Sequence, residues 1–360
     1  MPPSPAIVWQ NLPAASLHQD PALSAAWNRL NARRGDVPFL STEAITASLD
    51  SFGTGRERLL VGRQEEAIAA MFLLVRTSAA EWQSFQPSQL PLGAWVADDR
   101  LPVLDLARSL IRGPLGFCLL LSVTQIDPLH VARPTDTADS QSSDYIRTAW
   151  TELQGSFAEY WNQRGKNLRQ NMRKQRNRLA GEGISGHLRV LDQPVEMAAA
   201  IERYGALESA GWKAGEGTAI HPENSQGKFY RRLLESAAMR GEAVVFEYLF
   251  DDRVVATNLC LRREDVLVIL KTTYDESIQS YSPAFLLSQD EIELLYREGR
   301  IRRIEYYGRM MEWHSRWTEN SRVLYHLTLY RWPLVQRLAE WRRRRKQAGG
   351  GASAITPKIA

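Results

Sequence analysis

The chain of 360 residues has few cysteines and no long apolar run. Its two cysteines, Cys118 and Cys260, lie in apolar, strand-like segments, which indicates small buried thiols rather than a disulfide or a metal site. No run reaches the roughly 18 to 20 apolar residues that cross a bilayer, and the segment MPPSPAIVWQ lacks the basic start and apolar core of a signal peptide. We therefore expect a reduced, cytoplasmic protein without a metal.

Net charge is also small. Lys and Arg number 45 and Asp and Glu 41, so the formal net charge is only +4. A general nucleic-acid binder would carry a larger excess of positive charge, so DNA is not an expected partner. With 44% apolar residues, a chain of this length can bury a large core and divide into two globular units.

The strongest charge feature is the segment from Arg164 to Arg178, which holds seven basic residues and no acid. A helix is predicted over 157–181, with a narrow apolar stripe on one side. Basic residues repeat along it at helical spacing: Lys166, Arg169, Arg173 and Arg176. They form either the solvated face of a helix that bridges two domains or a site for the phosphates of a cofactor, a nucleic acid or an anionic lipid.

Strand and helix patterns alternate on both sides of this segment and predict a mixed α/β protein. In the first half, the apolar runs 58–62 and 67–75 suit a hairpin, and a helix over 101–111 precedes a buried strand over 117–128. The second half contains three strands in succession, a helix and two further strands. We expect these elements over 242–250, 254–262, 266–273, 283–297, 301–307 and 323–331. The order strand, turn, helix and strand across Lys271 to Trp317 indicates a ligand site.

Five segments, in this order, resemble one known family. They are YWNQRGKNLRQNMRKQRNRLAGEGI, LESAGWKAGEGTAI, FYRRLLESAAMRGEAVVFEYLFDDRVVATNLCL, YDESIQSYSPAFLL and YYGRMMEWHSRW. The sequence looks like the GNAT acyltransferase superfamily and, more narrowly, is similar to the CelD-like (BioF-like) acetyltransferase domain family. That family is related to the FemAB aminoacyl transferases, which have two GNAT domains. The resemblance covers about half of the chain, from Tyr160 to Tyr330.

The resemblance implies an α/β (α+β) acyl-CoA N-acyltransferase fold, with two GNAT-like mixed-sheet halves in tandem. The expected divisions are an N-terminal extension and helix over 1–35, a degenerate first GNAT-like domain over 36–155, a basic bridging helix over 156–183, a second GNAT domain with the site over 184–332, and a basic C-terminal helix with a disordered tail over 333–360.

The resemblance also implies acyl-CoA as a cosubstrate, with an acetyl or a longer acyl group. Its pantetheine arm would lie between two separating strands, and its pyrophosphate would meet the N–H groups at the start of the helix at Pro283. Ser282 would cap that helix, whereas Tyr281 would contact the acyl carrier or fill the core. The implied cofactor-binding residues are Lys271, Thr272, Tyr281, Ser282, Pro283 and Ala284.

Acyl transfer to an amine requires a base for the ammonium and an acid for the leaving thiolate, but no covalent intermediate. Glu312 and His314 are the candidate bases; His314 alternatively stacks against neighbours, and Glu305 is either a further candidate or a solvent-facing strand residue. Tyr306 and Tyr307 alternate faces, so one can reach the site as an acid; we select Tyr307. The candidate substrate-binding residues are Trp212, Lys213, Arg309, Trp313 and Arg316.

The chain departs from the family's pattern at the end of this region. Tyr306 and the pair Met310 and Met311 stand where the family has acids, His314 replaces a Lys, and Ala284 replaces a Gly. The cofactor scaffold is kept, while the acceptor network is altered. A more apolar acceptor, or reduced activity, follows from these changes.

Three functions fit the sequence. The first is an N-acyltransferase that uses a small-molecule or lipid-linked amine in exopolysaccharide, cell-envelope or lipid metabolism. The second is a FemAB-like transferase with aminoacyl-tRNA as donor, and the third is a non-catalytic partner of a polysaccharide-secretion system. A C-terminal helix with Leu334, Leu338 and Trp341 on one edge precedes the basic run Arg342 to Lys346, which either is solvated or contacts anionic lipid at the inner face of the membrane.

Overall fold

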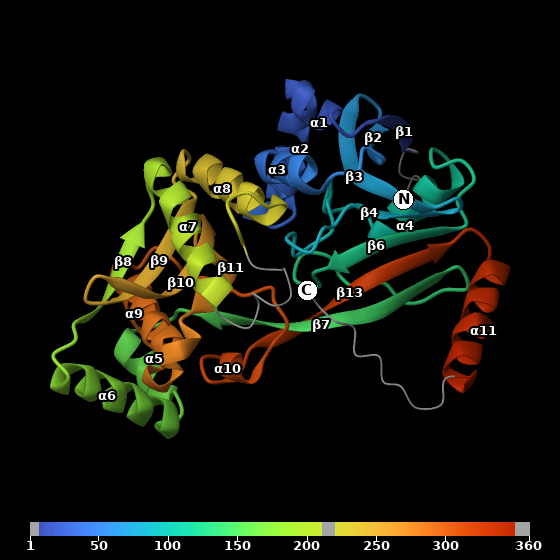
Figure 1. Cartoon of the computed structure of the whole chain (residues 1–360). Coiled ribbons are helices and arrows are strands. Elements are labelled where there is room, and N and C mark those ends of the chain that lie inside the picture. Colours follow the sequence, from blue (N-terminus) through green and yellow to red (C-terminus); the bar gives the residue numbers. More distant parts are fainter. Residues whose placement is uncertain (1–6, 211–219, 350–360) are drawn as a thin grey trace. The chain divides into compact units, whose positions relative to one another are not determined.

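The computed structural model describes residues 7–210 and 220–349 (Figure 1). The chain divides into two compact units. Unit 1 comprises the described residues of 1–146 and 323–360, and unit 2 comprises those of 147–322. The sequence suggested a boundary after the strand at 323–331. The structure instead assigns this strand to unit 1, because it pairs with a strand near residue 120.

Unit 1 is built on a mixed sheet. Its strand order is β1 (Val8–Pro13), β2 (Glu57–Gln64), β3 (Ala67–Ser78), β4 (Glu81–Ser84), β6 (Leu120–Ile126) and β13 (Ser321–Tyr330), while β5 (Trp95–Ala97) also pairs with β3. All of these pairs are antiparallel except β4 with β6. The predicted hairpin is therefore confirmed as β2 and β3, and the predicted buried strand as β6.

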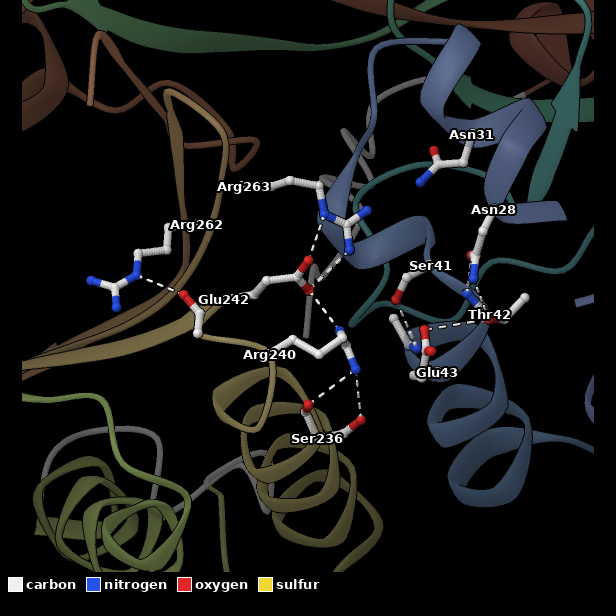
Figure 2. Close-up of polar contacts among 12 residues, drawn as sticks. Asn28, Asn31, Ser41, Thr42, Glu43, Ser236, Arg240, Glu242, Arg262 and Arg263 are labelled. Atoms are coloured by element: carbon white, nitrogen blue, oxygen red, sulfur yellow. Dashed lines mark hydrogen bonds and ion pairs between the residues drawn. The ribbon is translucent and has the colours of Figure 1, made fainter. Parts of the chain in front are cut away.

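The helices of unit 1 are α1 (Ser16–Gln19), α2 (Pro21–Arg33), the short 3₁₀ turn η1 (Pro38–Leu40), α3 (Thr42–Phe52), α4 (Val103–Arg112) and α11 (Pro333–Gly349). α4 corresponds to the helix predicted over 101–111. Figure 2 shows how α3 begins: the Ser41 hydroxyl accepts a hydrogen bond from the Ala44 N–H at 3.3 Å, while Asn28 binds Thr42 through both its amide atoms. Such a cap satisfies N–H groups that have no acceptor within the helix.

Unit 2 has its own mixed sheet. The order is β7 (Ser140–Glu152, of which the part from Arg147 lies in this unit), β12 (Arg303–Glu305), β11 (Val266–Tyr274), β10 (Arg253–Arg263), β9 (Ala243–Phe250) and β8 (Gly186–Leu191). Only β11 with β12 is parallel. The three strands predicted in succession are confirmed as the antiparallel meander β9, β10 and β11.

Helices cover both faces of this sheet. α6 (Lys166–Gly181) and α9 (Pro283–Glu298) pack against one face, through a core that includes Leu168, Leu286 and Ile304. α7 (Pro194–Ala210) and α8 (Ser225–Ala238) contact the strands from the other face. Where α8 leads into β9, Glu242 accepts hydrogen bonds from Arg240 and Arg263 at 2.9 to 3.0 Å (Figure 2). The shorter elements of the unit are α5 (Phe157–Gln163), η3 (Glu276–Tyr281) and α10 (Glu312–Ser315).

The prediction of a single helix over 157–181 is wrong in one respect: the structure has two helices there, α5 and α6. The chain leaves α5 at Arg164, whose backbone is extended at φ −68° and ψ 151°, and α6 restarts after Gly165. Gly165 is also extended, at φ −54° and ψ 139°. Arg164 covers the break, since its guanidinium lies 4.5 Å from the Tyr160 ring centroid and also donates to the Trp317 carbonyl.

Candidate functional site

The strands β11 and β12 pair over only three residues, from Val266 with Arg303 to Val268 with Glu305. β12 ends there, whereas β11 continues to Tyr274 along β10. The two strands therefore separate after Val268. A pocket of about 270 Å³ lies at this separation, lined by side chains of β10, β11, the start of α9 and the segment after β12.

A β-bulge decides which side chains of β11 face this pocket. Lys271 pairs with Leu259 and Ile269 pairs with Cys260, so Leu270 is an extra residue in β11. Without it, alternation would turn Lys271 to the same side as Ile269. The bulge shifts the phase, so that Ile269, Thr272 and Tyr274 all line the pocket.

Lys271 consequently lies on the opposite face of the sheet from Ile269 and Thr272. Its Nζ is 3.1 Å from Oε1 of the buried Glu208 on α7. The ammonium also lies 6.0 Å and 5.7 Å from the ring centroids of Tyr204 and Tyr230. Of the two adjacent cofactor-binding candidates on β11, Lys271 and Thr272, only Thr272 lines the pocket.

The start of α9 forms one wall of the pocket through Ser282, Pro283, Ala284 and Phe285. Ser282 has the left-handed backbone conformation, with φ 55° and ψ 49°. Its side chain does not cap the helix, which corrects the prediction: the hydroxyl instead accepts a hydrogen bond of 3.2 Å from the Asn171 amide on α6. The first N–H groups of a helix have no acceptor within it and carry partial positive charge, so this end of α9 suits an anion.

Aromatic side chains form much of the remaining pocket wall, next to Phe285. Phe285 stacks on Trp317 with ring centroids 5.8 Å apart, and Tyr306 meets Trp313 edge to face, also at 5.8 Å. The Tyr306 hydroxyl lies 3.3 Å from Thr151 Oγ1. Burial raises the pKa of Tyr306 above its usual value, so its hydroxyl keeps its proton.

Of Tyr306 and Tyr307, it is Tyr306 that lines the pocket. Tyr307 follows at a positive φ of 50°, and its ring centroid lies 5.3 Å from the Arg322 guanidinium. Glu305 is buried and forms an ion pair with the same Arg322 at 2.9 Å. The expectation that Glu305 faces solvent is therefore wrong, and its carboxylate is neutralised by an arginine outside the pocket lining.

Glu312 and Arg316 pair with each other on α10 at 2.9 Å, and the Glu312 side chain is 84% exposed. Arg309 is exposed as well. Among the candidates in this segment, only Trp313 contributes to the pocket lining.

His314 is buried beneath Trp313, with ring centroids 3.6 Å apart. Its Nδ1 accepts a hydrogen bond of 2.9 Å from the Met311 N–H. Burial lowers the pKa of His314 to about 4, so the ring is neutral near pH 7. A neutral imidazole that accepts at Nδ1 carries its proton on Nε2, which leaves no free lone pair for a base. This geometry favours the stacking alternative for His314.

Tyr281 does not line this pocket. The Tyr281 hydroxyl donates to Glu182 at 2.7 Å, and the Arg178 guanidinium covers its ring at 3.7 Å. Trp212 and Lys213 lie outside the described residues. Within the ranges 7–210 and 220–349, no group of three or more His, Cys, Asp and Glu side chains could hold a metal ion.

A buried polar pair beside the pocket was not predicted from the sequence. Asn258 of β10 lines the pocket, and its Nδ2 donates to Oε2 of Glu291 on α9 at 2.6 Å. Burial raises the pKa of Glu291 to about 8. A signal was present: Glu291 stands between Leu287 and Leu295 at four-residue spacing, on what is otherwise the apolar face of the helix.

Part of the chain matches a known protein family, and the fold recurs in solved structures. Residues 166–315 match the family model described as an acetyltransferase (GNAT) domain. No curated protein matches the chain in sequence. Among solved structures, the chain is similar to FemX, with a TM-score of 0.53 and 8% identity over 91% of this chain and 99% of that one.

Two further solved structures share the fold. One is the C-terminal domain of a putative lysylphosphatidylglycerol synthetase from Agrobacterium fabrum, with a TM-score of 0.51, 12% identity, and coverage of 85% of this chain and 91% of that one. The other is a conserved protein of unknown function from Bacteroides thetaiotaomicron, with a TM-score of 0.52, 11% identity, and coverage of 90% and 100%. The predicted tandem acyl-CoA N-acyltransferase fold is confirmed. Residues 166–315 of the chain form an acetyltransferase (GNAT) domain.

Proposed function

We propose that the chain is an N-acyltransferase, which moves an acyl group from acyl-CoA to an amine by direct attack, without a covalent enzyme intermediate. One observation carries the proposal: the pocket at the separation of β11 and β12 adjoins the first turn of α9. A long, thin cosubstrate with phosphates at one end needs a slot for its arm and N–H donors for its phosphates, and these two elements supply both.

In this proposal, the pantetheine arm lies along the edge of β11 that β12 does not pair, past Thr272. The pyrophosphate meets the N–H groups of the first turn of α9, near Ser282, Pro283 and Ala284. The exposed basic side chains of α6 add positive charge, since Asn171 of that helix contacts Ser282. We keep Thr272, Ser282, Pro283 and Ala284 as cofactor-binding residues; Lys271 and Tyr281 point elsewhere.

The chemistry then assigns a role to Tyr306. The amine nitrogen attacks the thioester carbonyl, a C–N bond forms, and the C–S bond breaks with its electron pair on sulfur. The protonated Tyr306 hydroxyl donates its proton to the leaving thiolate and regains one from solvent. The described lining contains no carboxylate and no imidazole. We therefore propose that the acceptor enters as the neutral amine and releases its second proton to water.

The acceptor side of the pocket is apolar. Trp313, Trp317 and Phe285 form its wall, and Met310 packs against the same core. These side chains suit an amine that carries an apolar or ring-shaped body. We propose a small-molecule or lipid-linked amine of exopolysaccharide, cell-envelope or lipid metabolism, in agreement with the narrower CelD-like resemblance.

A second candidate donor is aminoacyl-tRNA. The similarity to FemX over 91% of the chain and the exposed basic side chains of α6, Lys166, Arg173 and Lys174, favour it. Binding through phosphates would weaken steeply with salt, whereas a single CoA would depend on salt much less.

A turnover assay separates these candidates. Purified protein is incubated with a panel of amines and either acetyl-CoA, a long-chain acyl-CoA or aminoacyl-tRNA, and release of free CoA thiol or deacylation of the tRNA is followed. Thiol release that depends on the amine supports acyl-CoA transfer. Amine-dependent deacylation of tRNA, with no thiol release, would favour the FemAB-like alternative. CoA binding without turnover would point to the non-catalytic partner.

A further inference from the structure

α11 carries an apolar stripe that the rest of unit 1 leaves uncovered. Leu334, Leu338 and Trp341 recur at spacings of four and three residues and so share one face of the helix. These side chains and the adjacent Trp332 are 52% to 64% exposed. Exposed apolar side chains gathered on one helix face, rather than scattered singly, mark an interaction surface.

A further exposed apolar side chain, Phe117, lies on a loop that is bonded to the residue after β13. Arg331, at the end of β13, donates through its side chain to the carbonyls of Ile111 and Gly116 at 2.8 and 2.9 Å. Its backbone N–H donates to the Leu119 carbonyl at 2.9 Å. These bonds tie the loop of Phe117 to Arg331, two residues before α11 begins, and the Phe117 side chain is also more than half exposed.

Positive charge adjoins this surface. Arg345 follows Trp341 by one helical turn and covers its ring at 4.4 Å from guanidinium to ring centroid. The sequence from Arg342 to Lys346 is entirely basic, Arg337 precedes it, and Glu340 is the one acid among residues 333–349. Long basic side chains can bury their stems beside apolar groups while their charged ends remain in water.

We propose that α11, together with Phe117 and Trp332, docks the protein on an anionic lipid surface. Tryptophan and leucine side chains enter the boundary between headgroups and acyl chains, while the arginines meet the lipid phosphates. α11 would lie in the plane of the membrane: within the described ranges, no helix has the length and apolarity needed to cross one. This inference stands on α11 and its neighbours alone and does not depend on acyl transfer.

The combination of charge and apolarity selects a membrane over a second copy of the chain. A self-complementary interface would bring the basic runs of two α11 helices together, and their mutual repulsion would oppose pairing. Phosphatidylglycerol supplies the missing negative charge. Each basic residue near such a surface adds to the affinity, and salt weakens the attraction.

Vesicle sedimentation of the full chain tests the proposal. Vesicles of phosphatidylcholine, with and without phosphatidylglycerol, are spun with wild-type protein at low and at high salt. We expect sedimentation with the phosphatidylglycerol vesicles, weakened by salt, and little with phosphatidylcholine alone. The triple variant Leu334→Ser, Leu338→Ser, Trp341→Ser should lose about a hundredfold in vesicle affinity, because three apolar side chains no longer enter the lipid.

Two further variants keep the result interpretable. Replacing Arg342 to Lys346 with Gln keeps the apolar stripe and should remove the preference for phosphatidylglycerol. Val195→Ser, at an exposed apolar residue of unit 2, should leave vesicle affinity unchanged. Because Leu334, Leu338, Trp341 and Val195 are exposed, the melting temperatures of their variants should stay close to that of wild type. Equal binding to both vesicle types, unchanged binding by the triple variant, or a dimer that depends on the stripe would each overturn the proposal.

Discussion

Asn258 Nδ2 donates a hydrogen bond of 2.6 Å to Oε2 of Glu291, which joins the middle of the sheet of unit 2 to the buried face of α9. The other carboxyl oxygen, Glu291 Oε1, has no hydrogen-bond partner among the described residues. A carboxylate in this position would be a buried charge without a cation, so the fold favours the protonated acid. As an uncharged acid, Glu291 therefore joins the middle of α9 to β10.

Glu291 should make stability depend on pH. Its folded pKa of about 8 lies above the usual value of 4.5, so its contribution to stability is fully present below 4.5 and is lost as pH rises to about 8. In Glu291→Gln the titration is absent, and the variant should gain stability relative to wild type by up to about 1.4 kcal/mol per pH unit between those values.

Urea unfolding at several pH values between 4 and 9 measures this difference. Glu293→Gln, at an exposed position of the same helix, is the matched control and should follow the wild-type profile. A constant difference between wild type and Glu291→Gln across this range would mean that Glu291 ionises normally in the folded protein.

His314 should have the opposite pH dependence. Because burial lowers its pKa to about 4 from 6.5, its contribution to stability is present above 6.5 and is lost as pH falls to about 4. His314→Asn keeps an acceptor for the Met311 N–H and should remove this acid sensitivity, whereas His314→Ala leaves that N–H unpaired and should cost about 1 to 3 kcal/mol at pH 7. Thermal unfolding of both variants from pH 4 to 8 provides the check; an acid sensitivity that persists in His314→Asn would assign it to another group.

Tyr306 and Tyr307 should differ in turnover. If the Tyr306 hydroxyl protonates the thiolate, Tyr306→Phe should lower kcat by about a hundredfold or more, while the dissociation constant for acyl-CoA changes little. Tyr307→Phe should retain most of the wild-type kcat, since Tyr307 contacts Arg322 and does not line the pocket. Steady-state kinetics of the two variants, side by side, decide between the tyrosines. A loss confined to Tyr307→Phe would restore Tyr307 as the acid.

Lys271 should matter for folding rather than for acyl-CoA binding. Lys271→Met removes the ammonium that lies 3.1 Å from the buried Glu208 carboxylate, which should cost about 3 to 5 kcal/mol in the free energy of unfolding. Lys271→Met combined with Glu208→Gln removes both charges and should recover part of this loss. Chemical denaturation measures these differences, and calorimetry of the double variant should give an acyl-CoA affinity within a few-fold of wild type. A large loss of affinity without a loss of stability would return Lys271 to the cofactor site.

Periodicity predicted several elements of unit 2 because they are long or strongly apolar, whereas the fold itself was implied by the family resemblance. The sequence predicted the meander of β9 to β11 and the helix from Pro283 for this reason. The break at Arg164 and Gly165 could not be predicted, since the apolar stripe of α5 and α6 runs through it almost in phase. The assignment of β13 to unit 1 depends on pairing with β6, a contact between residues some two hundred positions apart that no local pattern records.

The residues that line the pocket were harder to predict from the sequence than the helices and strands. The bulge at Leu270 reverses which residues of β11 face the pocket, and a run of apolar residues gives no sign of it. The choice between Tyr306 and Tyr307 depends in the same way on the phase of a three-residue strand. Glu305, Glu312 and His314 have the residue types that catalysis needs, but an ion pair, solvent exposure and burial, respectively, decide what each of them does.

The central claim is that acyl-CoA occupies the space between β11 and the start of α9. Isothermal titration of acetyl-CoA, a long-chain acyl-CoA and CoA into wild type and Ala284→Phe tests it most directly. The phenylalanine fills the pocket wall at the first turn of α9, while Ala180→Phe, at an exposed position of α6, is the matched control. The account predicts saturable binding to wild type and to Ala180→Phe, and at least about tenfold weaker binding to Ala284→Phe. Absence of binding by any of the three ligands at concentrations up to about 1 mM, or equal binding by Ala284→Phe, would contradict it.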